Sequence, residues 1–444
     1  MKKSTWFIVF SIVFGMIHSL HSQNLTSRLG SLGFVNISKI EIESKRYSEA
    51  YEIFLNQPID HKDSAKQQFQ QRVFVRHRGF DRPTVMVTEG YVAEYAKYPR
   101  YDEELAYYLD ANLVVVEHRF FGKSVPDPKK WEYLTLENAT ADLHNVNQLL
   151  KSIYTGPWIS TGISKGGQTT IYYKYFYPDD VQASVPYVAP LNFSVADKRV
   201  FQFQDTVATE ECRTNLKEIQ RDLLERREIF GKMFGDSTAA RNLTFDKVGG
   251  IDKAFEYNVL ELGFAYWQWY PIQCADLPKA GGEAKDVFNA FVAAAGYDFF
   301  ADQSIADFEP FFYQALTEMG FYTYNTTDFK DLLLYVKDPN FNHTLPEGIA
   351  VKYDNSLNRK VNRWLNKKGD NMLYVYGAYD AWASTAVQVG KKTNSRKYLL
   401  AEGSHATRLR NFDEKRRNEA IELVKSWIID YKNPQIKLSS SLSD

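Results

Sequence analysis

The sequence predicts an α/β protein in which a doubly wound, mostly parallel sheet is interrupted by an inserted helical cap domain. From about residue 49 to residue 192, short β-type runs alternate with helical runs. Residues 193–350 are instead dense in helical and aromatic sequence, with few apolar β-type runs. Strand-like sequence returns at residues 371–376 (NMLYVY) and 397–400 (KYLL), so one α/β domain with an insertion is the simplest arrangement.

Each element of the first half has a local signature. The wholly apolar run LVVV at residues 113–116 is expected of a strand that is buried on both faces. Residues 102–110 have an amphipathic helical pattern, with Asp102 as the expected N-cap. The predicted strands are 70–75, 84–88, 113–116, 158–161 and 185–188, and the predicted helices are 102–110, 135–153 and 168–177.

The insertion and the C-terminal end are predicted to be mainly helical. Amphipathic patterns at residues 216–229 and 288–295 predict two helices of the insertion, and residues 413–430 predict a closing helix. Residues 264–270 (FAYWQWY) carry five aromatic side chains in seven positions. Such a density favours extensive buried packing or an aromatic-lined pocket.

Five parts of the chain are expected. Residues 1–22 are interpreted as a signal peptide, and residues 437–444 as a disordered tail. Residues 23–192 and 351–436 are expected to form the two parts of the core, and residues 193–350 the helical cap.

The N-terminal segment has the layout of a secretory signal. Lys2 and Lys3 precede an apolar run at residues 6–17, and polar and small residues follow as far as Ser22. The apolar run is short for a stable membrane span, although a short N-terminal anchor is the alternative. We therefore expect cleavage after Ser22 and export to the periplasm or the extracellular space, with no membrane attachment afterwards.

Composition excludes several classes of protein. The 54 basic and 55 acidic side chains give a formal net charge of -1, which lacks the electrostatic footprint of a nucleic-acid binder. The two cysteines, Cys212 and Cys274, are expected to form a disulfide in an oxidising compartment, with two buried free thiols as the alternative. Neither a CxxC nor an HExxH motif occurs in the sequence, so no metal or other cofactor is indicated.

One serine lies in a motif that is typical of a catalytic nucleophile. Residues 162–166 (GISKG) match G-x-S-x-G, with Ser164 at the centre, after the predicted strand at 158–161 and before a helix. Strand, tight turn and helix together form the nucleophile elbow of an α/β-hydrolase. A glycine turn with an incidental serine is the alternative interpretation.

A serine nucleophile needs a base, and the base needs a carboxylate that orients it. In an α/β-hydrolase these residues follow in the order Ser, Asp or Glu, His. Only His343 and His405 follow Ser164, and His343 lies between two prolines in a segment expected to be a surface loop. His405 follows the strand-like run KYLL, and Asp380 follows NMLYVY. Order and loop position therefore select Ser164, Asp380 and His405 as the catalytic triad.

Two backbone amides are candidates for an oxyanion hole. One is the amide of Lys165, directly after the nucleophile. The other should come from the loop after an earlier strand, where residues 88–91 (TEGY) indicate the amide of Tyr91. Gly90 would allow this backbone to approach a substrate closely, although a simple βα turn is the alternative.

Taken together, these motifs resemble the secreted serine exopeptidases related to prolyl carboxypeptidase. The closer resemblance is to the bacterial tripeptidyl aminopeptidase family whose members prefer proline. It extends from about residue 50 to the loop of His405, and its most specific segment is 117–124. The matching segments are 57–61 (QPIDH), 71–73 (QRV), 88–91 (TEGY), 117–124 (EHRFFGKS), 162–167 (GISKGG), 211–213 (ECR), 267–269 (WQW) and Cys274.

The resemblance implies an activity and a substrate class. It implies that Ser164, Asp380 and His405 act as the triad, and that residues 193–350 cover the site as a cap. It also implies peptide substrates, the removal of short units from their N-termini and a preference for proline. The residues 117–119 are expected to brace the site through hydrogen bonds.

An aminopeptidase also needs an anion for the free ammonium group of its substrate, because burying that charge unpaired is costly. Four acids on the loop after residue 88 or in the cap are candidates, although an acid at such a position is more often a solvated surface residue. They are Glu89, Glu94, Glu210 and Glu211.

Two other functions are compatible with the sequence. A secreted esterase or lipase on the same fold would keep the triad and change the cap pocket. A binding protein that retains a hydrolase scaffold would lack a reactive Ser164. The intact set of Ser, Asp and His favours an enzyme over the second possibility.

Overall fold

The fold is built on one central sheet. The computed structural model describes residues 24–429 and 431, and within them the sheet has nine strands in the order β1-β2-β3-β5-β4-β6-β7-β8-β9. The strands from β5 to β9 pair in parallel, whereas β1, β2 and β3 form an antiparallel edge. The strands are β1 (Val35–Lys39), β2 (Glu49–Pro58), β3 (Gln68–His77), β4 (Thr84–Thr88), β5 (Asn112–Val116), β6 (Trp158–Ile163), β7 (Ala183–Tyr187), β8 (Leu373–Gly377) and β9 (Arg396–Leu400).

The predicted mostly parallel α/β architecture is confirmed. Each strand predicted from the apolar runs overlaps a strand of the sheet, and the LVVV run lies in β5, where every residue is buried. Two further strands, β1 and β2, extend the sheet beyond the predicted set. The predicted signal peptide and the predicted tail lie outside the described residues.

Helices cover both faces of the sheet, and the side chains of β4 show how. Met86 packs in a cluster with apolar residues of α2 and α4, whereas Val85 and Val87 pack with residues of α3 and α13 on the other face. The alternation follows from the two-residue period of a strand. The covering helices are α2 (Leu25–Ser31), α3 (Glu104–Tyr108), α4 (Leu136–Lys151), α5 (Lys165–Phe176), α12 (Ser356–Lys368), which packs against α5, and α13 (Glu414–Ile428).

The prediction that Asp102 caps the helix at 102–110 is wrong. Helix α3 begins two residues later, and the Glu103 carboxylate accepts the amide of Ala106 at 2.9 Å. Asp102 instead accepts a hydrogen bond from the Tyr47 hydroxyl at 2.6 Å and pairs with Arg46. A tertiary contact with a residue far away in the sequence has overridden the local capping preference.

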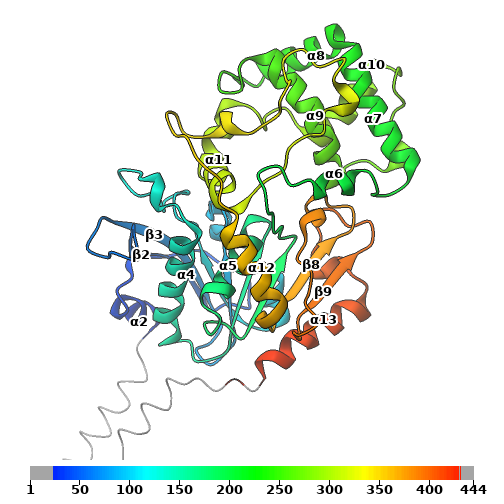
Figure 1. Cartoon of the computed structure of the whole chain (residues 1–444). Helices are drawn as coiled ribbons and strands as arrows, with labels where there is room; N and C mark the ends of the chain where they lie inside the picture. The colour runs from blue at the N-terminus through cyan, green and yellow to red at the C-terminus, as the bar shows by residue number, and fades with distance from the viewer. Residues whose placement is uncertain (1–23, 430, 432–444) are drawn as a thin grey trace, which may run out of the picture.

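Between β7 and β8 the chain forms a group of helices that stands apart from the sheet (Figure 1). The core part of this group is the long helix α9, against which α7, α8 and α10 pack. These helices share one large apolar cluster, rich in aromatic rings. They are α6 (Arg199–Gln204), α7 (Glu210–Glu225), α8 (Arg227–Ala239), α9 (Ile251–Trp269), α10 (Ala284–Ala295) and α11 (Asp302–Gln314).

One helix predicted for this group is wrong in its extent. The pattern at residues 216–229 belongs to two helices, because the chain bends at Arg226 between α7 and α8. Helix α7 starts at Glu210, where the Thr209 hydroxyl accepts the amide of Cys212. Cys212 is joined by a disulfide to Cys274, which follows α9, so the predicted pairing is present in the structure.

The expectation that His343 lies in a surface loop is also wrong. Its ring packs against Tyr257, Phe300 and Phe341 within the aromatic cluster of the cap. Burial, together with the positive charge of Lys253, lowers the pKa of His343 to about 4. The short polar segment around it does not reveal that Tyr257 and Phe300, from two distant parts of the chain, pack on it.

No helix in the described part of the chain is both long enough and apolar enough to cross a bilayer.

A buried ion pair ties the antiparallel edge to the parallel part of the sheet. Arg72 on β3 and Glu117 after β5 are both fully buried and directly paired. The Glu117 carboxylate also accepts the amides of Ala93 and Lys123, at 3.0 and 2.8 Å, and the Ser124 hydroxyl at 2.9 Å. Glu117 therefore holds the loop after β4 in place from beneath, which is the bracing role expected of residues 117–119.

We predict that Glu117→Gln lowers the free energy of unfolding by about 3 kcal/mol, because it leaves the buried Arg72 charge without its main partner. Urea denaturation followed by circular dichroism measures the change. The matched control is Glu94→Gln, which removes a half-exposed partner of the same arginine and should cost less than about 1 kcal/mol. Equal losses for the two variants would contradict the prediction.

A second prediction concerns pH. The pKa of His343 is about 4 in the folded state and 6.5 when unperturbed, so the unfolded state binds the proton first on acidification. The free energy of unfolding should therefore decrease as the pH falls from 6.5 towards 4. Unfolding curves across this range should have a smaller pH slope for His343→Gln than for the unsubstituted protein. An unchanged slope would show that this ring does not carry the effect.

Candidate active site

The strand order locates the site before any side chain is considered. Strand β4 lies between β5 and β6, so the chain leaves it first towards one edge of the sheet and later continues towards the other. Ligands of open α/β sheets bind at the carboxyl ends of strands at such a switch point. The loop of Tyr91 follows β4, and Ser164 follows β6, so the structure brings these two predicted elements side by side.

Ser164 occupies a strained turn between β6 and α5. Its φ is 56° and its ψ is -121°, a conformation that few residues other than glycine adopt. The turn is held by the Ser164 amide, which donates to the Tyr187 carbonyl at 2.9 Å. A Cβ atom on Gly162 would lie 2.3 Å from the Gly166 carbonyl oxygen, so the turn requires glycine there. This is the geometry of a nucleophile elbow.

Asp380 and His405 meet although they are 25 residues apart in the sequence. Asp380 lies in the loop after β8, His405 lies in the loop after β9, and Asp380 Oδ2 is 2.7 Å from His405 Nδ1. The other carboxylate oxygen accepts the amide of Trp382 at 3.0 Å. Because Nδ1 faces the carboxylate, Nε2 is the nitrogen available on the opposite side of the ring.

Ser164 and His405 both line one large cavity. Its volume is about 1060 Å³, and it lies between the carboxyl end of the sheet and the helices α9, α10 and α11. Most of the wall is aromatic or aliphatic, and its polar side chains come from both the core, such as Ser164 and Arg408, and the cap, such as Glu261. A mostly apolar cavity of this size with a few placed polar groups is typical of a substrate site.

The loop after β4 touches the elbow directly. The Lys165 ammonium donates to the Gly90 carbonyl at 2.7 Å and lies over the rings of Tyr91 and Phe121. Burial lowers the pKa of Lys165 well below its usual value, and only the negative charge of Glu89 opposes this. The Lys165 backbone amide starts α5, where amides have no partner within the helix.

Glu89 lines the cavity and is the one of the four proposed acids that does so within the described residues. Burial raises the pKa of Glu89, while hydrogen bonds from the Tyr95 hydroxyl and the amides of Gly90 and Tyr91 oppose the increase. A substrate oxyanion would therefore compete with the Glu89 carboxylate for the Tyr91 amide.

The other three acids lie elsewhere. Glu94 is paired with Arg72 and Lys97, at the foot of the loop after β4. Glu210 and Glu211 are exposed at the start of α7, where Glu211 lies 3.7 Å from Lys279. None of them belongs to the described lining of the cavity.

Sequence reasoning missed several functional candidates in the wall. Glu261 is a buried carboxylate, Glu103 is a partly buried one and Asp298 is an exposed one, and Trp382 is an aromatic side chain next to Asp380. The sequence carries one signal for Glu261, which is a charged residue in an otherwise apolar stretch of an aromatic-rich helix. That signal gives no indication of what the side chain faces.

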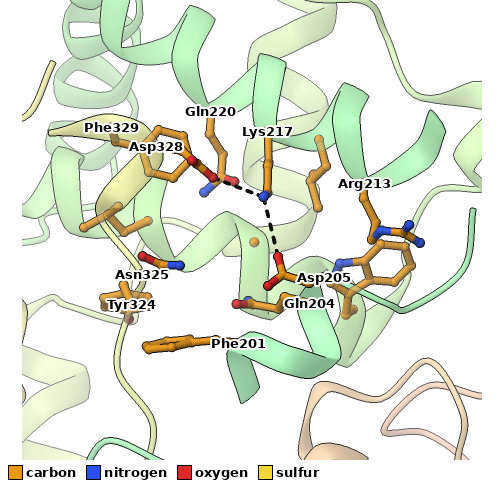
Figure 2. Close-up of a pocket in the computed structure, with 14 residues that line it drawn as sticks. Phe201, Gln204, Asp205, Arg213, Lys217, Gln220, Tyr324, Asn325, Asp328 and Phe329 are labelled. Carbon is orange, nitrogen blue, oxygen red and sulfur yellow. Dashed lines mark ion pairs between the residues drawn. The ribbon is translucent and has the colours of Figure 1, made fainter. Parts of the chain in front are cut away.

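A second, much smaller cavity lies on the other flank of α9, among residues of α6, α7 and the segment after α11 (Figure 2). Its volume is about 60 Å³. The Lys217 ammonium there lies between the carboxylates of Asp205 and Asp328, at 3.6 and 3.1 Å. The cavity is too small for a substrate, and its lysine is already paired with two carboxylates, so nothing suggests a binding site at this place.

Comparisons with known proteins agree with this geometry. A family model described as PS-10 peptidase S37 matches residues 23–428. The prolyl tri/tetrapeptidyl aminopeptidase of Streptomyces mobaraensis is 32% identical over 379 residues, which cover 84% of this chain and 78% of that protein. The chain belongs to the PS-10 peptidase S37 family. It is a serine peptidase, and the family resemblance that its motifs indicated is confirmed.

More distant relatives match parts of this S37 peptidase. Human lysosomal Pro-X carboxypeptidase is 27% identical over 197 residues, which cover 40% of this chain and 37% of that protein. Among solved structures, a proline iminopeptidase of Mycobacterium smegmatis aligns with 85% of this chain and 100% of its own, at 13% identity and a TM-score of 0.43.

We predict that Gly90→Ala lowers kcat about 100-fold, since a Cβ atom there would lie 2.7 Å from both Gly166 N and Lys165 Cβ. The loop would have to move away from the elbow, and the oxyanion donors would move with it. Steady-state kinetics on a peptide amide measures the effect. Gly235→Ala in α8 is the control, because an added Cβ there meets nothing within 4 Å and activity should be unchanged.

Proposed function

We propose that this peptidase is an exported serine exopeptidase that removes short units, of about three residues, from peptide N-termini with a preference for proline. One observation carries the proposal: a strained serine and a hydrogen-bonded Asp–His pair open into the same capped cavity. The names of the Streptomyces and lysosomal relatives support the preference for proline. The disulfide between Cys212 and Cys274 supports an oxidising location.

The catalytic cycle assigned to the site proceeds through an acyl-enzyme. The Ser164 hydroxyl attacks the scissile carbonyl while His405 Nε2 accepts its proton and then returns it to the leaving amine. Asp380 fixes the tautomer of His405 and stabilises the imidazolium. The amides of Lys165 and Tyr91 stabilise the oxyanion. In the second half of the cycle a water molecule gives a proton to His405 and attacks the acyl-enzyme ester, and His405 returns the proton to the Ser164 oxygen as the acid product leaves.

Residues 193–350 act in this proposal as the cap that encloses the substrate. Their aromatic rings line the cavity from above, through residues such as Phe308, Phe311 and Phe321. A proline ring and apolar side chains would be desolvated against these faces. In an exopeptidase that acts on N-termini, the part of a long substrate that follows the scissile bond has to extend out of the cavity.

The decisive test uses a chromogenic peptide amide with a free N-terminus and proline before the scissile bond. Ser164→Ala should lower kcat by about 10⁵-fold, and Asp380→Asn by about 10⁴-fold, because each removes one member of the triad. Labelling with a fluorophosphonate probe should occur at Ser164 in the unsubstituted enzyme. An Asp370→Asn variant, at the opposite end of β8, is the matched control and should retain activity.

The esterase alternative makes a different prediction. An esterase would cleave simple p-nitrophenyl esters and leave the proline-containing peptide amides intact. That outcome would contradict the peptidase proposal while leaving the triad in place.

A further inference from the structure

We propose that Glu261 binds the ammonium group at the N-terminus of the substrate, and that its position on α9 sets the length of the released unit at about three residues. The inference rests on the proposed exopeptidase function and adds to it the residue that recognises the free N-terminus. It differs from the four acids that the sequence indicated.

The surroundings of Glu261 leave one side of the carboxylate open. The residue is 4% exposed and lines the main cavity. Its Oε2 accepts the hydroxyls of Tyr322 and Tyr324, at 2.8 and 2.5 Å. Within the described part of the chain, no cation pairs with this carboxylate and no donor bonds to Oε1. The ionised form of an almost fully buried acid is costly without a cation, so the carboxylate stays protonated unless a ligand supplies one.

Another acid of the same helix, Glu256, is a buried carboxylate whose charge is compensated within the protein. Glu256 is fully buried, lies 2.8 Å from the Arg227 guanidinium and accepts the amides of residues 334–336. It has a cation and its oxygens are satisfied. Glu261 accepts hydrogen bonds from both of its tyrosine neighbours, but it lacks a cation such as the one that Glu256 has. Glu261 also lines the cavity, whereas Glu256 does not.

The distance along α9 matches a short peptide. The carbonyl of Gln268, near the end of this helix, accepts the amide of His405 at 2.8 Å, and the Trp269 ring packs on the His405 ring with centroids 5.6 Å apart. Seven residues separate Glu261 from Gln268, which corresponds to about 10 Å of helix. Three residues of extended peptide also span about 10 Å. Consider a substrate that lies along α9 with its scissile bond at Ser164. The third residue before that bond, which is the N-terminal residue of a released tripeptide, then lies near Glu261.

A continuous wall joins the two ends of this path. Trp382 donates its amide to Asp380, and its ring packs against Phe264 and Tyr322 with centroids 5.0 and 5.3 Å apart. Tyr322 in turn donates to Glu261. The acyl part of the substrate would thus lie on rings, between the triad at one end and a carboxylate at the other.

The other carboxylates of the cavity are less suited to this role. Both oxygens of Glu89 already accept hydrogen bonds, from Tyr95 and the Gly90 amide. Glu103 caps α3 through the amide of Ala106. Asp298 is exposed to solvent, where an ion pair contributes little, and it is the competing candidate.

Protonation is consistent with the assignment. Burial raises the pKa of Glu261 to about 8, and the hydroxyls of Tyr324 and Tyr322 offset only part of the increase. An arriving ammonium group favours the ionised carboxylate. A blocked N-terminus brings no such charge, so recognition depends on the free amine.

The test compares Glu261→Gln with the unsubstituted enzyme on two substrates, a tripeptidyl amide with proline before the scissile bond and its N-acetylated analogue. We expect kcat/KM for the free-amine substrate to fall about 100-fold, mainly through KM, with little change for the acetylated one. Tyr324→Phe should give a smaller loss in the same direction. Fluorophosphonate labelling of Ser164 at the normal rate shows that the variant is folded.

Glu210→Gln, at an exposed position outside both cavities, is the matched control and should behave as the unsubstituted enzyme. Retention of the full free-amine preference by Glu261→Gln would overturn the assignment, as would its loss in Asp298→Asn instead. Equal rates for dipeptidyl, tripeptidyl and tetrapeptidyl amides would overturn the length argument. Failure of the proposed function looks different, because the unsubstituted enzyme would then cleave none of these amides.

Discussion

The close approach of two backbone segments at the switch point of the sheet is the constraint on which the site depends. The loop after β4 passes so near the start of α5 that Gly90 has no room for a side chain and a Cβ atom on Gly166 would lie only 3.0 Å from the Thr88 carbonyl oxygen. Lys165 then fastens the two segments through the Gly90 carbonyl, and Glu117 holds the same loop through the amide of Ala93. The proposed nucleophile and the proposed oxyanion donors are therefore positioned by one packed unit of backbone and not by two independent loops.

Buried charges in this molecule fall into two kinds, and the difference is informative. Arg72 with Glu117 and Arg119 with Asp142 are fully buried pairs with further hydrogen bonds, so their desolvation is offset within the protein. Such groups define how elements fit together. Glu261 has only hydroxyl donors, and its missing cation is the feature that distinguishes a group built for a ligand from a group built for the fold.

The sequence predicted those parts of the structure that depend on the local spacing of apolar and polar residues. The strands from β3 to β9 and the helices α4, α5 and α13 follow from the spacing of apolar residues, and the structure adds that Thr135 and Asp413 cap α4 and α13. The meeting of Asp380 with His405 followed from element order, because the carboxyl ends of neighbouring parallel strands share one edge. Errors arose where distant residues decide, as at Asp102, which bonds to Tyr47, and at His343, which aromatic rings enclose. Glu261 belongs to this second group, since the helix pattern does not show which acid faces the cavity.

Helix α9 makes the cap a part of the catalytic machinery and not a detachable cover. Its last turn accepts the His405 amide through the Gln268 carbonyl, and its middle carries Glu261 in the cavity wall. The disulfide ties α7 to the segment directly after α9, which limits how far that last turn can shift relative to its neighbours. A displacement of the cap large enough to open the cavity along α9 would therefore also disturb the imidazole. In the proposed function, substrate length, recognition of the free N-terminus and the alignment of His405 are then set by one rigid element, because the same helix would contact both ends of the acyl group.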